Sequence, residues 1–151
     1  MAAYLPSSSL HRIQGVAGLL LLLTLPLPWL RRTAGDAEAW VPGWWLASGD
    51  AEVGDSPIPT FLAVLVLALV LAVAVTAALS WWRRSVGAAV SAGGLSLAAV
   101  FVMVGAASPR ELAASGVDQS VAPGLMLAVF LCGTVLVSCL ALLATVTPDD
   151  A

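Results

Sequence analysis

The residues best suited to chemistry lie in one hydrophilic segment between Gly35 and Asp55, which reads GDAEAWVPGWWLASGDAEVGD. Carboxylates there could bind a cation or a basic solute, and indole rings could stack on a ligand or lie among lipid headgroups. The segment contains the tetrapeptide GDAE twice. We take its acidic and tryptophan side chains as a candidate contact surface: Asp36, Glu38, Trp40, Trp44, Trp45, Asp50, Glu52 and Asp55.

A specific metal site is the sharpest interpretation of this segment, but the spacing argues against it. Calcium takes about six to eight oxygen ligands from a preorganised loop with glycine and glutamate at fixed positions. The two GDAE copies are instead separated by a stretch that includes Trp-Val-Pro-Gly-Trp-Trp. We therefore predict a surface that acts by contact, with its rings among headgroups and its carboxylates in water, and no bound metal.

Elsewhere the chain offers little for catalysis. Its single histidine, His11, stands at the edge of the first apolar segment, whereas haem binding between helices needs axial ligands such as paired histidines. Cys132 and Cys139 lie about 10 Å apart along one helix, too far for a disulfide and unlike the Cys-x-x-Cys pair of thiol oxidoreductases. We predict no catalytic residue and no cofactor, and the chain is not expected to be an enzyme.

Composition indicates the elements that position these residues. The chain of 151 residues is 60% hydrophobic and 10% charged, with a formal net charge of -3. Soluble domains carry about 25% charged residues, and nucleic-acid binding requires clustered Lys and Arg, so we predict an integral membrane protein with no nucleic-acid partner. Four apolar segments are each long enough to cross a bilayer as a helix. They cover about 13–30, 58–82, 86–107 and 121–146, with an outer loop at 31–57.

The predicted fold is thus a single all-α domain, residues 1–151, formed by a compact bundle of four transmembrane helices. Ser108-Pro109-Arg110-Glu111 has the form of a capping box, which favours a short surface helix over 109–115 between the third and fourth spans. Pro26 and Pro28 weaken the outer end of the first span.

The first span has a second interpretation, as a secretory signal peptide. Arg12 precedes its apolar core, and Ala37-Glu38-Ala39 has the small-x-small form of a cleavage site. Arg31 and Arg32 directly follow the apolar run, which favours an uncleaved membrane anchor instead.

Arginine placement predicts the orientation. Arg83 and Arg84 occupy a tight turn without acids, which favours the cytoplasmic side, and Arg12 agrees. Arg31, Arg32 and Arg110 would then lie outside, so the count of arginines is equal on the two sides. The tight turn, which has no acid to neutralise its arginines, decides the predicted orientation. We predict cytoplasmic N and C termini in the plasma membrane of a bacterium, because the use of Arg without Lys suggests a GC-rich genome.

Small residues recur at helical spacing in three spans. Such stripes allow helix backbones to approach closely, either within this chain or against another membrane protein. They are Ala68, Ala72, Thr76 and Ser80; Gly87, Ser91, Gly94 and Ala98; and Gly124, Ala128 and Cys132.

The order of LPLPWL, an acidic outer loop, PIPTFLAVLVLALVLAVAV and RRSVGAAVSAGGLSLAAV resembles the four-span conserved membrane proteins associated with tryptophan-operon regions in GC-rich bacteria. The resemblance covers about Leu19 to Val104. It implies the same four-helix layout, and it implies no catalytic residues, because that family has no established biochemical activity.

Two functions remain open from the sequence. The first is a non-catalytic structural or accessory subunit in the lipid bilayer, with an acidic, tryptophan-rich outer loop that meets a partner or the lipid surface and with small-residue faces that could contact another membrane protein. The second is an oligomeric transport or solute-binding module, in which the acidic loop forms a mouth that attracts cations.

Overall fold

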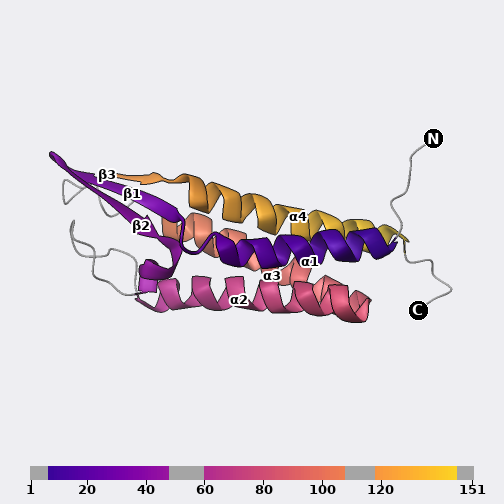
Figure 1. Cartoon of the computed structure of the whole chain (residues 1–151). Helices are drawn as coiled ribbons and strands as arrows, with labels where there is room; N and C mark the ends of the chain where they lie inside the picture. Colours follow the sequence, from indigo (N-terminus) through magenta and orange to yellow (C-terminus); the bar gives the residue numbers. More distant parts are fainter. Residues whose placement is uncertain (1–6, 48–59, 108–117, 146–151) are drawn as a thin grey trace.

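The computed structural model describes residues 7–47, 60–107 and 118–145. Four helices lie side by side and alternate in direction, and a small sheet projects from one end of them (Figure 1). The helices are α1 (Ser7–Leu23), α2 (Thr60–Arg83), α3 (Val86–Ala107) and α4 (Pro123–Thr145). The strands are β1 (Pro28–Ala34), β2 (Ala37–Pro42) and β3 (Asp118–Val121), and a short 3-10 helix, η1, covers Gly43–Ala47.

Each helix packs mainly against two others. α1 contacts α2 and α4, and α3 contacts the same two helices from the other side. Close approach is possible because glycine and alanine stand at the crossings: an added Cβ at Gly18 of α1 would lie 2.5 Å from the Cβ of Ala77 in α2. The packing of α3 on α4 is equally tight at Gly93, where an added Cβ would lie 2.7 Å from the Cys139 sulfur.

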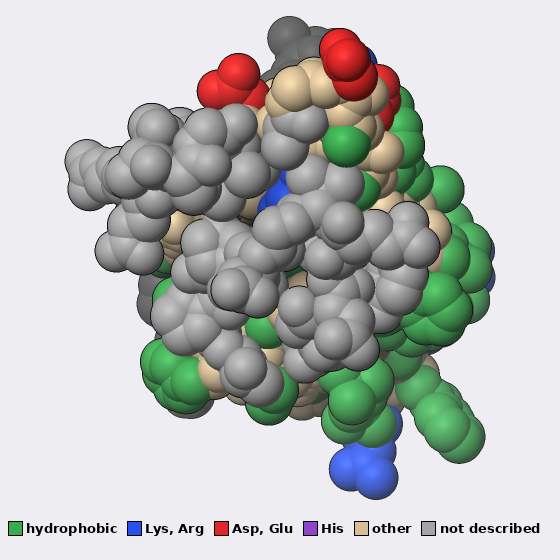
Figure 2. Space-filling model, turned by 90° about the vertical axis from the view of Figure 1, so that its left-hand side faces the viewer, with side chains coloured by type: hydrophobic (Ala, Val, Ile, Leu, Met, Phe, Trp, Pro, Cys, Tyr) green, Lys and Arg blue, Asp and Glu red, His purple; other side chains and the backbone are tan. Residues whose placement is uncertain are grey.

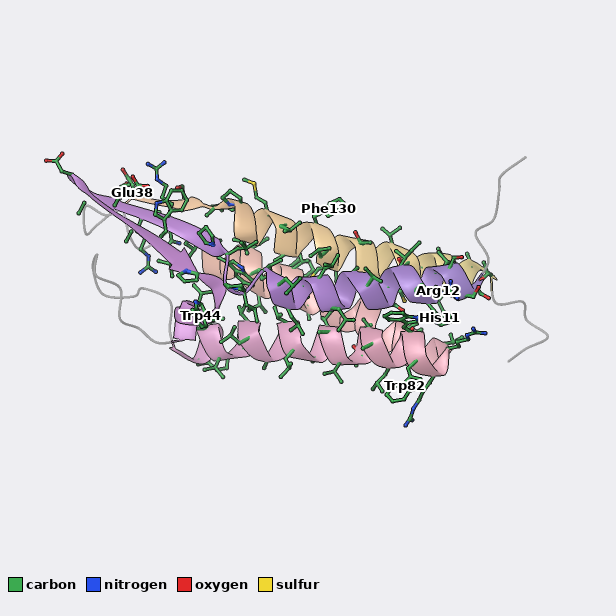
Figure 3. The ribbon with its side chains drawn as sticks, viewed as in Figure 1. His11, Arg12, Glu38, Trp44, Trp82 and Phe130 are labelled. Atoms are coloured by element: carbon green, nitrogen blue, oxygen red, sulfur yellow. The ribbon has the colours of Figure 1, made fainter. Side chains whose placement is uncertain are left out.

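Among the residues that the structure describes, three helices are long and apolar enough to cross a membrane: Phe61–Arg83 within α2, and α3 and α4 in full. Their outward faces carry large apolar side chains, among them Phe61, Phe101 and Phe130, which are 71%, 72% and 69% exposed. Phe130 points away from its neighbouring helices in Figure 3. The prediction of a mostly helical chain with membrane-compatible helices is therefore confirmed in this coarser form.

The first helix differs from its predicted bounds. We predicted a span over 13–30, but α1 begins at Ser7 and ends at Leu23. Pro26 lacks an amide hydrogen and its ring disfavours helical geometry in the preceding turn. The chain instead forms a tight turn, in which the amides of Thr24 and Leu25 donate to the carbonyls of Leu21 and Leu22 at 3.1 and 3.2 Å.

The sheet was not predicted, so the all-α description is incomplete. β1 lies in the centre and pairs antiparallel with both β2 and β3. A two-residue turn joins β1 to β2, and Gly35 within it has a φ of 58°, a left-handed value that glycine adopts at little cost. Part of the predicted outer loop is thus strand, and the fourth helix begins at Pro123 instead of Val121. The predicted surface helix over 109–115 lies outside the described residues.

Candidate functional site

The hairpin is fixed to the helices by Trp29. Its side chain is 1% exposed, and its indole Nε1 donates to the Thr24 carbonyl at 2.7 Å. Two glycines leave room for the ring, because an added Cβ would lie 2.5 Å from it at Gly43 and 2.9 Å from it at Gly124. Trp29 is thus a core residue that positions β1.

The exposed surface of the hairpin carries a compact charged cluster. The Arg31 guanidinium donates from Nε and Nη2 to the two carboxylate oxygens of Glu38, at 2.8 and 3.0 Å. The same guanidinium lies 5.4 Å from the ring centre of Trp40, within the range of a cation–π interaction. Glu38 is therefore ion-paired with a residue of the neighbouring strand. The register allows this contact, because it places Arg31 opposite Trp40 and Thr33 opposite Glu38, so that Arg31 and Glu38 are diagonal neighbours.

The next arginine along β1 is buried. Arg32 is 1% exposed, and its Nε donates to the Gln119 side-chain oxygen in β3 at 3.1 Å. Burial lowers the pKa of the Arg32 guanidinium. Because Gln119 also donates toward the Ala107 carbonyl at 3.5 Å, the pair joins β1 and β3 to the end of α3.

The structure describes five of the eight residues of the predicted contact surface. Asp36 is exposed in the hairpin turn, Glu38 and Trp40 are exposed on β2, and Trp44 is 63% exposed in η1. Figure 2, which looks onto this end, shows acidic side chains gathered at one edge and hydrophobic ones on the flanks. Trp45 also belongs to η1. Asp50, Glu52 and Asp55 lie outside the described residues.

A polar network at the opposite end was missed by sequence reasoning. His11 is 4% exposed, and its Nδ1 lies 2.8 Å from the Ser80 hydroxyl oxygen of α2. That hydroxyl donates to the Gln14 side-chain oxygen at 2.7 Å, and the Gln14 amide nitrogen donates to the Ala89 carbonyl of α3 at 3.0 Å. Side chains of α1 thereby join three helices. Figure 3 shows His11 at the end of the molecule far from Glu38.

The sequence of donors and acceptors in this network shows which ring nitrogen of His11 carries a hydrogen. Gln14 uses its amide nitrogen on a backbone carbonyl, so its oxygen must accept the single hydroxyl proton of Ser80. Ser80 can then only accept from His11, which places a hydrogen on Nδ1. A sequence signal existed: His11, Gln14, Gly15 and Gly18 recur at helical spacing on one face.

The predicted small-residue stripes point in different directions. Gly124, Ala128 and Cys132 of α4 are all buried, as expected if the stripe packs within this chain, and Gly124 lies against the Trp29 ring of β1. The stripe on α2 runs obliquely, from exposed Ala68 to buried Ser80.

On α3 the stripe faces outward. Gly87, Ser91, Gly94 and Ala98 are all exposed, and the same line continues through Phe101 and Gly105. A Cβ added at Gly94 or Gly105 would meet nothing within 4 Å. We call this line of six residues, spaced alternately by four and three, the α3 seam. The Ser91 hydroxyl donates to the Gly87 carbonyl at 3.0 Å, so the seam presents no unpaired hydroxyl hydrogen there.

Comparison with protein-family models, curated proteins and solved structures gives no match to this chain.

Proposed function

We propose that the protein is a non-catalytic four-span membrane protein, a helical bundle that serves as a structural or accessory subunit in a bacterial plasma membrane. The apolar outer faces of α2, α3 and α4 support a bilayer location. α1 has 17 residues, about 26 Å at 1.5 Å per residue, which covers most of a hydrocarbon core about 30 Å thick. The cytoplasmic side is assigned to the end that carries Arg12, Arg83 and Arg84.

The observation that carries the proposal is the outward direction of the α3 seam. Lipid tails are as apolar as leucine, so helices in a bilayer associate through close packing, which small residues permit. Within this chain the small faces of α1 and α4 serve that purpose, but the seam packs against none of the described residues at Gly94 or Gly105. A helix of another membrane protein would gain contact there that lipid chains do not provide.

The spacing of the seam specifies how such a helix would lie. Alternation of four and three residues follows a period of 3.5, the repeat of helices that cross at about +20° in left-handed pairs. Val90, Leu97 and Val104 form a parallel exposed line beside the seam. These larger side chains could pack around the partner helix while the glycines allow its backbone to approach.

A pair of matched glycine variants tests this proposal. Gly94→Leu would fill the seam, whereas Gly133→Leu introduces the same side chain on α4, where an added Cβ also meets nothing within 4 Å. Affinity purification from native membranes in mild detergent, with quantitative mass spectrometry, should recover a stoichiometric membrane partner with the wild type and with Gly133→Leu. Gly94→Leu should lose it. Recovery of a clean wild-type monomer, or equal loss from both variants, would contradict the proposal.

The alternative, a transport or binding module with an acidic mouth, has weaker support. Of its five carboxylates, Asp36 and Glu38 are described, and Glu38 is paired with Arg31. Replacement of all five by amides should abolish uptake or binding under this alternative, and should leave partner recovery unchanged under the first.

A further inference from the structure

The end of the molecule opposite the sheet has a cavity that the proposed function does not use. It lies between the N-terminal part of α1 and the C-terminal end of α2 and has a volume of about 490 Å³. Its lining includes Ser8, His11 and Arg12 from α1, and Trp81 and Arg84 from the other side. Of the described residues that line it, none is acidic, so the charge of the cavity is positive.

We propose that this cavity binds the headgroup of an anionic phospholipid from the surrounding bilayer. Arg12 and Arg84 would hold the phosphate through charge-assisted hydrogen bonds, with Ser8 as a further donor. Basic pockets between helices at the cytoplasmic side are a recognised form of lipid headgroup site. The inference rests on the proposed membrane location, but it does not depend on the α3 seam.

The polarity of the cavity follows that of a lipid molecule. Ser8 and Arg12 lie near the start of α1, whereas Leu19 lines the cavity eleven residues after Ser8, about 16 Å further along the helix axis. The charged side chains of the cavity thus lie at the end of the helical bundle, and the apolar part of the cavity extends toward the middle of the helices. A small soluble anion would make no contact with the apolar part of the cavity, whereas the acyl chain of a lipid would pack against it.

The walls of the cavity are held in place. Trp81 packs on Gly15 of α1, where an added Cβ would lie 2.6 Å from the Trp81 Cβ. His11 is fixed by its hydrogen bond with Ser80, which leaves Nε2 as the ring nitrogen not engaged in that bond. The cavity is therefore preformed by the packing of α1 on α2.

The backbone at Arg84 provides a second, independent observation. Its φ is 50°, a left-handed value, and it is the residue that directly follows α2. Glycine is the usual residue at this position because side-chain-bearing residues are unfavourable there. Arginine at this strained position is explained if its side chain is needed to bind the lipid phosphate in the cavity.

Lipid titration by native mass spectrometry of the full chain in detergent tests the proposal. The wild type should retain phosphatidylglycerol in preference to phosphatidylcholine. Arg84→Gly and Arg12→Gln should each weaken phosphatidylglycerol binding about fivefold, the contribution expected of one arginine near a lipid surface. Arg83→Gln is the matched control, because Arg83 is exposed beside Arg84 but does not line the cavity, and it should change binding less than about twofold.

Several outcomes would overturn the proposal: equal retention of the two lipids, equal loss from Arg83→Gln, or displacement of the lipid by millimolar glycerol phosphate, which would indicate a soluble ligand. Arg84→Gly relieves the left-handed strain, so its melting temperature should not fall, which separates binding from folding. Gly94→Leu should keep full lipid binding, so failure of the lipid site and failure of the partner seam are distinguishable.

Discussion

Gly93 and Gly94 are consecutive in α3, yet the same methyl group should have opposite effects on them. A Cβ at Gly93 would lie 2.7 Å from Sγ and 2.8 Å from Cβ of Cys139 in α4. Carbon atoms in good contact are about 3.5–4.0 Å apart, so the space is about 1 Å too small. Rotation of the Cys139 side chain moves Sγ but leaves Cβ in place, so α3 and α4 must separate.

The magnitude follows from two opposing contributions. Overpacking of this kind costs about 1–3 kcal/mol, and exchange of glycine for alanine in a helix returns about 1 kcal/mol. Gly93→Ala should therefore lower the free energy of unfolding by up to about 2 kcal/mol. Gly94→Ala meets nothing within 4 Å and should raise it by up to about 1 kcal/mol.

Unfolding of the purified protein in mixed micelles, followed by far-ultraviolet circular dichroism as the fraction of denaturing detergent rises, measures both variants. The double variant Gly93→Ala/Cys139→Gly removes the Cβ that clashes and should show a favourable coupling free energy in a double-mutant cycle. Shifts of the same sign and size for Gly93→Ala and Gly94→Ala would refute the assigned faces of α3.

Three further variants test other parts of the structure. Trp29→Phe keeps most of the buried ring but removes the donor to the Thr24 carbonyl, so the free energy of unfolding should fall by about 1–3 kcal/mol in the same micelle assay. His11→Leu removes the donor to the buried Ser80 hydroxyl, so the free energy of unfolding should fall by about 1–3 kcal/mol in the micelle assay. Gly35→Val must adopt a φ of 58° and should destabilise the hairpin by about 1–2 kcal/mol, seen as faster amide exchange in β1 and β2 with unchanged exchange in α3.

Local features of the sequence account for much of the fold. Long apolar runs predicted α2, α3 and α4 to within a few residues, because a helix is the form in which an apolar segment satisfies its own backbone groups. The hairpin was missed although Gly35-Asp36, between two short segments that each contain a tryptophan, is a recognised two-residue turn signal. The length of the first apolar run predicted a helix that continues to residue 30, but Pro26 is unfavourable in a helix and α1 ends at Leu23.

The candidate site depended more strongly on tertiary packing. Placement of Glu38 beside Arg31 requires the register of β1 and β2, and burial of His11 and Trp29 requires neighbours that are distant in the chain. The direction of the α3 seam could not be derived from hydrophobic periodicity, because every face of that helix is apolar and lipid is as acceptable a neighbour as protein.

The sequence by itself therefore determined that the chain forms long apolar helices, with Arg12, Arg83 and Arg84 at one end and most of the acids near the other, since these follow from residue type and short-range order. Only the tertiary structure decided which faces meet and which remain open. Hydropathy measures transfer from water, whereas contact between apolar helices depends on the shape of the surfaces that they present to one another.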